Sequence, residues 1–531
     1  MLGQTLKGAE ARSHFLALIA ILLVAIVLRL VFLQGFVQSD PYSYAELAND
    51  LAQGKLLLND YNGALVFPLR IAFYGPVALF IKLFGLSEWT LVVFPFLISI
   101  AGCVLAYVLA RKLFGATAGL IAAGLLAILP TDIAMASTLF PDPVAAFWAN
   151  LGIVLLILDP DKDGSRQSLL YSLLAGVCFG ISWLNKETVV YVGPLVLIYL
   201  LLRKSSLLHL ACVGAIAFLF LFSEAAFYRA MTGDWLFHFH IVPKNYEQNA
   251  VWFFDQSSPY FGWGPGGHAH ALLRRLFISG PKAELTAFSK LTVFALFAAV
   301  WGAFCRDRRF VILGLWLVTQ VLFFNFGSSS LTSYRPLPLE YFERYLYPLL
   351  LPSVLLCSGF LALLYQRSEA LKLASAGRLG AAVVAIGVLA TIALSLKDLR
   401  PHPLQMIQHV AERLKPSDVV YTDYYTAQFL VFFAQNKILN SDELARAKPI
   451  IPYEKLSAED MRPGAYVVIN DRNVDYTVSR QGTTKYQPPE FYTRHPSSWK
   501  LILEERGVAL FKIEETNDGS DPKKDDKSDR M

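Results

Sequence analysis

The chain has 531 residues, of which 55% are hydrophobic and only 17% are charged, and its mean hydropathy is +0.44. This composition is too apolar for a soluble globular protein of this length, so we expect an integral membrane protein. The net charge of +5 is too small for a nucleic-acid-binding surface, and no nucleic-acid partner is expected.

Apolar runs long enough to cross the hydrocarbon layer of a membrane, roughly 30 Å thick, recur along the chain. The first of them is too long for a cleaved signal peptide and has no small-residue cleavage site, so we expect it to remain as a span. We expect about eleven transmembrane helices within residues 1–396, over 14–36, 90–110, 117–137, 143–158, 169–185, 188–202, 205–226, 284–305, 310–326, 345–366 and 379–396.

The stretch 66–86 is also apolar, but it contains Arg70 and Lys82 and is broken by two prolines. These features disfavour a spanning helix, so we expect this stretch to lie along the membrane surface.

Lysine and arginine in short loops predict the orientation, because such residues collect on the cytoplasmic side. With the spans numbered as above, the basic clusters all fall on one side: Arg111-Lys112, Arg203-Lys204, residues 305–309, and Arg367 with Lys372 and Arg378. The N-terminus is then cytoplasmic, and loops 37–89, 227–283 and 327–344 are external. In a bacterial cell this predicts a multi-pass protein of the inner (plasma) membrane.

Residues 397–514 have the pattern of a small α/β domain, which the same orientation places in the periplasm. Residues 418–422 and 465–471 alternate like strands, 426–436 are typical of a helix, and 499–513 of a hairpin that turns at Gly507. Residues 515–531 are charged and have no core-forming side chains, so a disordered tail is expected. The predicted fold class is therefore an α-helical polytopic membrane protein with a small periplasmic α/β C-terminal domain.

Several ionisable residues fall at the outer ends of the predicted spans: Asp40, Asp142, Lys186, Glu187, Glu343 and Arg344. One interpretation is that loops are where charges are tolerated, and that the two Asp-Pro pairs only start helices. Lys186 fits that interpretation poorly, because it has little loop around it and a charge at membrane depth needs a partner or a function.

Transfer of a sugar from a lipid phosphate would use this set of residues. A carboxylate must take the proton of the attacking hydroxyl, and fixed cations must meet the negative charge that collects on the departing phosphate. Asp40 is our candidate for the first role, and Lys186 with Arg344 for the second. Arg29, inside the first span, is either a further phosphate contact or a side chain that snorkels to the surface.

Five stretches carry a resemblance to a known family: "SDPYSYAELANDLAQGK" (39–55), "LARKLFGATAGLIAAGLLAILP" (109–130), "LFPDP" (139–143), "GISWLNKET" (180–188) and "ERYLYPLLLP" (343–352). They resemble the polytopic glycosyltransferases with the C-type fold, in the branch that contains protein O-mannosyltransferases and the lipid A aminoarabinose transferase. There an acidic residue after the first span, here Asp40, is followed by a tyrosine and a small-residue helix that ends in glycine, here Tyr44 and Gly54.

The resemblance implies an inverting transfer from a polyprenyl-monophosphate sugar to an extracytoplasmic acceptor, which is a protein, lipid A or a cell-envelope glycan. It implies that Asp40 is the base and that Asp142 assists it or orders the acceptor. Tyr44, Glu187, Glu343 and Arg29 are candidate supporting residues. Many relatives carry Asp-Glu where this chain has Asp40-Pro41, so a two-carboxylate or metal-binding role is not carried over.

Two further questions stay open at this point. Histidines in "FHFH" (237–240) and "HAH" (268–270) could hold a divalent metal, but no cysteine lies near them, so no cofactor or metal ligand is assigned. The alternative functions are a transporter or flippase of lipid-linked sugars, and a scaffold built around the external domain. Transporters place ionisable residues at mid-membrane and show paired repeats, and no internal repeat is visible here.

Overall fold

The computed structural model describes residues 2–33, 40–55, 58, 66–159, 166–202, 207–243, 283–326, 347–370, 386–387, 389–390, 393, 404–439, 441–446, 450–452, 460–470, 495–505 and 507–514. The chain divides into two compact units, Met1–Pro401 and His402–Met531. The predicted span 379–396 lies almost entirely outside the described residues, and the predicted disordered tail 515–531 lies wholly outside them.

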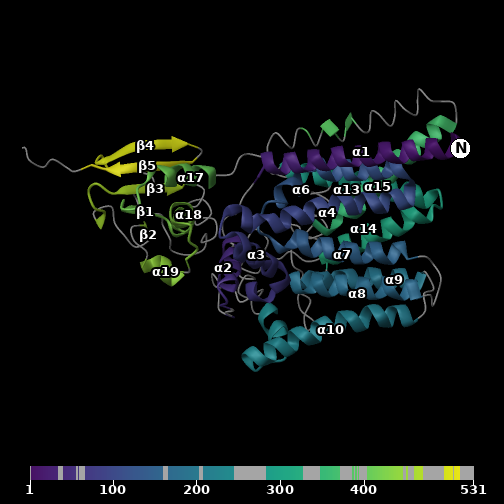
Figure 1. The fold of residues 1–531 in the computed structure, drawn as a ribbon, viewed down its shortest axis with the longest axis horizontal. Coiled ribbons are helices and arrows are strands. Elements are labelled where there is room, and N and C mark those ends of the chain that lie inside the picture. Colours follow the sequence, from purple (N-terminus) through teal and green to yellow (C-terminus); the bar gives the residue numbers. More distant parts are fainter. Residues whose placement is uncertain are drawn as a thin grey trace, which may run out of the picture. The chain divides into compact units, whose positions relative to one another are not determined.

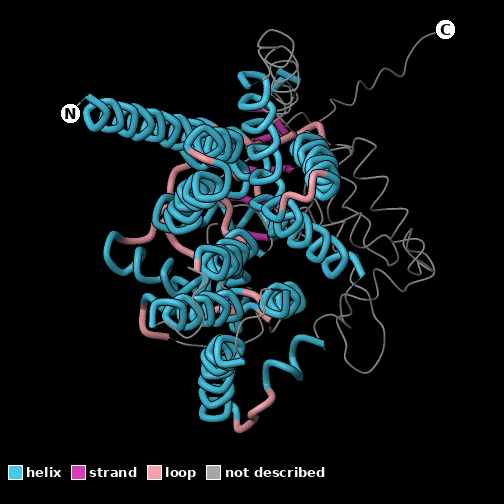
Figure 2. The backbone as a smooth tube through the Cα atoms, turned by 90° about the vertical axis from the view of Figure 1, so that its right-hand side faces the viewer, coloured by secondary structure: helices cyan, strands magenta, loops and turns pink. Residues whose placement is uncertain are grey.

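The first unit is a bundle of helices that run side by side, as Figures 1 and 2 show in two perpendicular views. Six described helices are long and apolar enough to cross a membrane: α1 (Leu2–Val31), α4 (Glu88–Phe114), α7 (Pro141–Leu158), α8 (Arg166–Asn185), α10 (Leu207–Thr232) and α15 (Leu350–Ala370). Shorter or less apolar helices complete the bundle: α5 (Ala116–Ile128), α6 (Pro130–Met135), α9 (Gly193–Leu202), α13 (Ala283–Phe304) and α14 (Arg308–Phe326). The predicted number of spans stays a prediction.

The predicted span 117–137 is wrong in one respect, because it is not a single helix. The helix α5 ends at Ile128, Leu129 is extended with φ −72° and ψ 120°, and α6 begins at Pro130. Proline has no N–H to donate and disfavours the helical conformation of the residue before it. The break leaves Asp132 buried in the first turn of α6.

Helices α2 (Asp40–Ala52) and α3 (Ile71–Phe84) pack against each other at one end of the bundle, on the left in Figure 1. The 3₁₀ turn Phe67–Leu69 precedes α3. With 14 residues, α3 is about 21 Å long, which is shorter than the hydrocarbon layer. This length agrees with the expectation that the stretch 66–86 is not a full span. We call this the α2–α3 end of the bundle.

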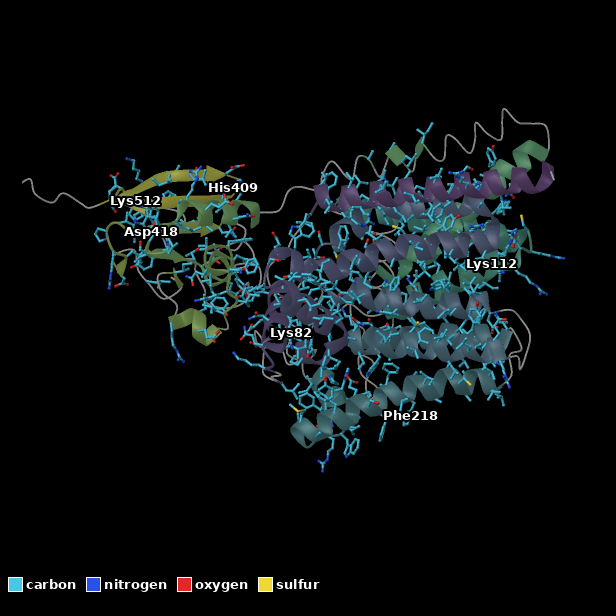
Figure 3. All side chains as sticks on the ribbon, viewed as in Figure 1. Lys82, Lys112, Phe218, His409, Asp418 and Lys512 are labelled. Atoms are coloured by element: carbon cyan, nitrogen blue, oxygen red, sulfur yellow. The ribbon has the colours of Figure 1, made fainter. Side chains whose placement is uncertain are left out.

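The opposite end of the bundle carries basic residues. Lys112 lies there, in the last turn of α4, far from Lys82 of α3 (Figure 3). Arg309, at the start of α14, donates to the Leu113 carbonyl oxygen over 2.8 Å and lies 5.0 Å from the Phe114 ring centroid. Arg309, of the predicted cytoplasmic cluster 305–309, therefore contacts the end of α4 that carries Arg111 and Lys112.

Residues 397–514 and the loop 159–167 are expected to lie on opposite sides of the membrane, with the loop in the cytoplasm. In a variant without the five native cysteines, a cysteine at Lys500 should react with a membrane-impermeant maleimide in spheroplasts. A cysteine at Asp163 should react only after the membrane is permeabilised. Lys500 is a suitable position because its side chain is 64% exposed. The reverse labelling pattern would contradict the predicted orientation.

The second unit is built on a five-stranded sheet in the order β2-β1-β3-β5-β4. β1 (Val420–Thr422) pairs in parallel with β2 (Ile450–Pro452) and β3 (Tyr466–Asn470), whereas β5 (Val508–Ile513) is antiparallel to β3 and to β4 (Trp499–Glu505). Helices α17 (Leu404–Arg413), α18 (Tyr424–Gln435) and α19 (Ser441–Arg446) complete it.

The local elements predicted for this unit are confirmed. β1, α18 and β3 occupy the stretches predicted as strand, helix and strand, and β4 and β5 form the predicted hairpin. Gly507 turns the hairpin with φ +79°, a conformation that favours glycine. The Asp423 side chain caps α18 by accepting from the Thr426 N–H.

Candidate active site

Asp40 and Tyr44 lie on the same face of α2, one turn apart. Asp40 is the first residue of the helix and is half-buried. Tyr44 is fully buried, and its ring makes T-shaped contacts with Phe67 and Phe73, with centroids 5.1 Å and 5.0 Å apart. Burial raises the pKa of Tyr44 well above its usual range, against the opposing effect of Arg70, so its hydroxyl keeps its proton.

Arg70 is a residue of this site that the sequence did not predict. It stands between the 3₁₀ turn and α3, is buried, and donates to the Tyr44 hydroxyl oxygen. Its Nη2 lies 3.5 Å from Oε1 of Glu187. The only signal in the sequence is a charge inside the apolar stretch 66–86, which we interpreted as disfavouring a span. The structure instead connects α2 to Glu187 through this guanidinium group.

Asp142 and Lys186 form a buried ion pair, with side chains 4% and 1% exposed. Asp142 lies in the first turn of α7, where a carboxylate is favoured by the helix dipole. Lys186 is extended, with φ −166° and ψ 134°, between the end of α8 at Asn185 and the 3₁₀ helix Glu187–Val192. Both aspartates of the Asp-Pro pairs therefore stand at helix starts, and Asp142 in addition holds a buried cation.

These side chains form one electrostatic cluster at the α2–α3 end of the bundle. Tyr44 lies in the electrostatic field of Asp40, Arg70 and Asp142. Glu187, at the start of the 3₁₀ helix Glu187–Val192, lies in that of Arg70, Lys186 and His238. The structure brings Arg70 together with five of the predicted site residues: Asp40, Tyr44, Asp142, Lys186 and Glu187. We call this set the polar cluster.

Glu343 and Arg344 lie outside the described residues, so their predicted roles stay predictions. The described part of the chain resumes at Tyr347, which starts the turn before α15.

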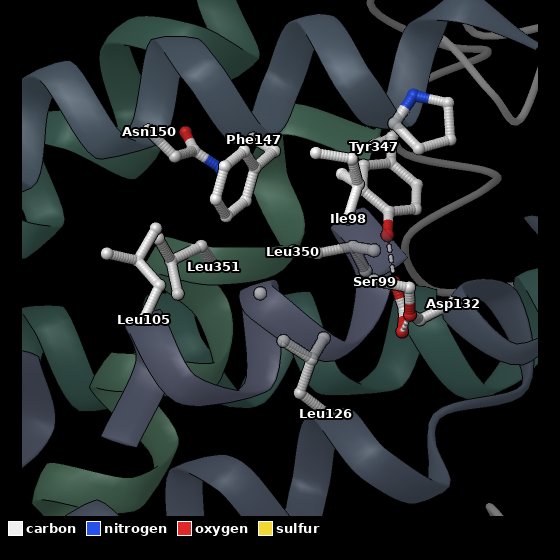
Figure 4. A pocket seen from close by; sticks show the side chains of 12 residues that line it. Ile98, Ser99, Leu105, Leu126, Asp132, Phe147, Asn150, Tyr347, Leu350 and Leu351 are labelled. Carbon is white, nitrogen blue, oxygen red and sulfur yellow. Dashed lines mark hydrogen bonds between the residues drawn. The ribbon is translucent and has the colours of Figure 1, made fainter. Parts of the chain in front are cut away.

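Arg29 does not snorkel, because it is fully buried and pairs with Asp132 of α6. It donates to the Ser99 hydroxyl oxygen over 2.7 Å and to the carbonyl oxygens of Ala25 and Ala127 over 2.9 Å each. Tyr347 donates to Asp132 as well (Figure 4). These contacts connect α1 to α4, α5, α6 and the start of α15, so in this structure Arg29 braces the bundle.

A small pocket lies beside this pair. Ser99, Asp132 and Tyr347 converge at one end of the pocket, Asn150 lies at the other, and the remaining labelled walls are apolar (Figure 4). The sequence did not predict a role for Asp132 or Tyr347.

The two histidines of "FHFH" have different surroundings. His238 is buried against Glu224, whereas His240 is exposed and pairs with Asp234 over 2.7 Å. Among the described residues, no group of three or more His, Cys, Asp or Glu side chains is arranged as a metal site. His268 and His270 lie outside the described part of the chain.

Known proteins share sequence features with this chain. Residues 74–227 match the family described as dolichyl-phosphate-mannose-protein mannosyltransferase. The chain is 25% identical over 366 residues to an undecaprenyl phosphate-alpha-4-amino-4-deoxy-L-arabinose arabinosyl transferase of Pseudomonas fluorescens. That match covers 67% of this chain and 61% of the relative, so it spans about three fifths of the relative's length.

A solved structure shares the fold over nearly the whole chain. The apo structure of ArnT from Cupriavidus metallidurans has a TM-score of 0.52 at 17% identity, covering 95% of this chain and 98% of that one. The same protein bound to undecaprenyl phosphate gives 0.50 at 17% identity, covering 93% and 97%. The predicted resemblance to C-type glycosyltransferases is confirmed, and so is the predicted class of a helical polytopic membrane protein.

Proposed function

We propose that this chain is a glycosyltransferase of the bacterial inner membrane that moves a sugar from a polyprenyl-phosphate donor to an extracytoplasmic acceptor, with inversion. The observation that carries the proposal is the polar cluster, in which three acids and two cations meet at one end of a membrane bundle. The relatives support it, since one is named for an undecaprenyl-phosphate sugar and a structure with the same fold holds undecaprenyl phosphate.

Asp40 is the proposed base. It is half-buried at the first turn of α2, so an acceptor hydroxyl can reach it. In the reaction the acceptor oxygen bonds to the anomeric carbon from the face opposite the phosphate, and the bond from that carbon to the phosphate oxygen breaks. The hydroxyl proton passes to the Asp40 carboxylate, and the polyprenyl phosphate leaves with the electron pair.

Arg70 and Lys186 are the proposed partners of the donor phosphate among the described residues, and Arg344 remains a proposed third. Each of the first two is paired with one carboxylate, Arg70 with Glu187 and Lys186 with Asp142. A planar guanidinium can bind two phosphate oxygens at once, and an ammonium adds a point charge. Negative charge that develops on the leaving phosphate would then be met by cations that are already in place.

One observation favours the alternative, a transporter or flippase. The Arg29–Asp132 pair is buried among helices of the bundle, and transporters place ionisable groups within the membrane. However, the guanidinium is also bonded to Ser99 and to two backbone carbonyls, which makes it part of a fixed network rather than a binding group. We therefore interpret the pair as structural.

The donor class can be tested with the purified protein in detergent. We expect transfer of a labelled sugar from a polyprenyl-monophosphate donor to an extracytoplasmic fraction of the cell envelope, and none from the corresponding nucleotide sugar. The reason is that the polyprenyl tail lies in lipid and holds the phosphate at the level of the polar cluster. Transfer from the nucleotide sugar alone would contradict the proposed donor class.

A further inference from the structure

Glu224, near the end of α10, is a buried carboxylate with two ring partners. Its Oε2 accepts from Nε1 of Trp183 over 2.5 Å, and its Oε1 lies 2.9 Å from Nδ1 of His238. The rings of Trp183 and His238 stack with centroids 4.7 Å apart. Hydrogen bonding and stacking together hold the His238 imidazole in one orientation.

The chemistry of these groups determines which His238 nitrogen is available. An ionised carboxylate only accepts, so the hydrogen between Oε1 and Nδ1 belongs to Nδ1. The other ring nitrogen, Nε2, is buried and has no hydrogen-bond partner among the described residues. A buried polar atom without a partner is costly, so an unfilled position of this kind indicates a group that is supplied from elsewhere.

The position of His238 in the fold indicates which kind of group binds its Nε2. Trp183 precedes Lys186 by three residues, and His238 contributes to the electrostatic field at Glu187, which contacts Arg70. The imidazole therefore lies beside the polar cluster, on the side that α8 and α10 form.

The proposed function places an anionic ligand, the donor phosphate, at the polar cluster. Lys186 is paired with Asp142 and Arg70 with Glu187, whereas the described partners of Glu224 are the neutral indole of Trp183 and His238. A His238 ring with a hydrogen on both nitrogens would balance the Glu224 carboxylate and present a charged N–H donor at Nε2. A phosphate oxygen is the acceptor that such a donor binds best.

We infer that His238 is a further donor-binding residue, whose Nε2–H donates to an anionic oxygen of the donor phosphate, while Glu224 and Trp183 position it. This inference rests on the proposed function, because the phosphate is that of the polyprenyl donor. It assigns a role to one histidine of "FHFH" that is not metal binding.

Two substitutions separate this role from a structural one. The amide nitrogen of asparagine takes the place of Nδ1, so His238→Asn can keep the hydrogen bond to Glu224. It has no donor at the position that Nε2 occupies in histidine. The longer glutamine reaches the place of Nε2, so His238→Gln can donate to the ligand but loses the bond to Glu224. His240→Gln is the matched control, because His240 is exposed and bonded to Asp234.

The measurement is the Kd for a polyprenyl monophosphate in detergent micelles, with thermal unfolding recorded beside it. We expect His238→Asn to raise the Kd by about tenfold or more, because a hydrogen bond to a charged group is lost. We expect His238→Gln to bind more tightly than His238→Asn, and His240→Gln to match the wild type.

A structural role predicts the reverse order, with normal binding in His238→Asn and weaker binding in the destabilised His238→Gln, and this order would overturn the inference. Equal binding in all variants would overturn it too, while the proposed function would stand. A wild-type protein that does not bind the polyprenyl phosphate would overturn both.

Discussion

Replacing Asp40 with asparagine is expected to lower the turnover of sugar transfer by about two to four orders of magnitude. Asparagine keeps the size of the side chain and most of its hydrogen bonding, but it cannot take the proton of the acceptor hydroxyl. Binding of the donor should survive, since the proposed phosphate partners are Arg70 and Lys186 rather than this carboxylate. The measurement is kcat and donor KM for the purified variant.

The same substitution tests the simpler role of Asp40 as the first residue of α2. Asparagine ranks with aspartate at a helix N-terminus, so a helix-starting role predicts an Asn variant with the same stability and the same activity. Alanine would confuse the two roles. A folded Asp40→Asn protein with near-normal transfer would remove the carboxylate from the mechanism. Asp142→Asn, assayed in parallel, would show whether the base is the other acid.

Replacing Lys186 with methionine is expected to have the largest effect on stability. The Lys186–Asp142 pair is almost completely buried, so the substitution leaves Asp142 as a buried carboxylate without its cation. Breaking a buried pair in this way costs about 3–5 kcal/mol of the free energy of unfolding. Unfolding in detergent, followed by heat or by denaturant, measures this loss.

The double variant Lys186→Met/Asp142→Asn separates stability from function. With both charges removed, most of the lost stability should return, because an uncharged buried pair has no desolvation penalty to offset. Donor use should remain impaired, since a phosphate partner is still absent. A double variant that regains wild-type donor KM and kcat would show that the pair only holds α7 against α8.

Local patterns in the sequence predicted the elements well. The β4–β5 hairpin follows from alternation on either side of Gly507, and most helices of the bundle follow from hydropathy and length. Hydropathy alone does not predict the end of α5, because it continues through Leu129 and Pro130, although Pro130 disfavours the helical conformation at Leu129.

Partners that are distant in the sequence could not be predicted in this way. Arg70 meets Glu187 across 117 positions, and Arg29 meets Asp132 across 103. No local periodicity contains such a pairing. A charge within an apolar stretch has two interpretations, a break in a span or a buried partner, and only the packing of helices decides between them. For Arg29 and Arg70 alike, the partner is a carboxylate on another helical element.

The proposed function is tested most directly by the fate of the donor lipid in detergent micelles, where no second compartment exists for a transporter to fill. The wild-type protein with a polyprenyl-monophosphate sugar and an envelope acceptor should release one free polyprenyl phosphate for each sugar transferred, and Asp40→Asn should release almost none. Recovery of the intact donor after incubation with wild-type protein, which still binds that donor, would contradict the proposed transferase and favour a transporter.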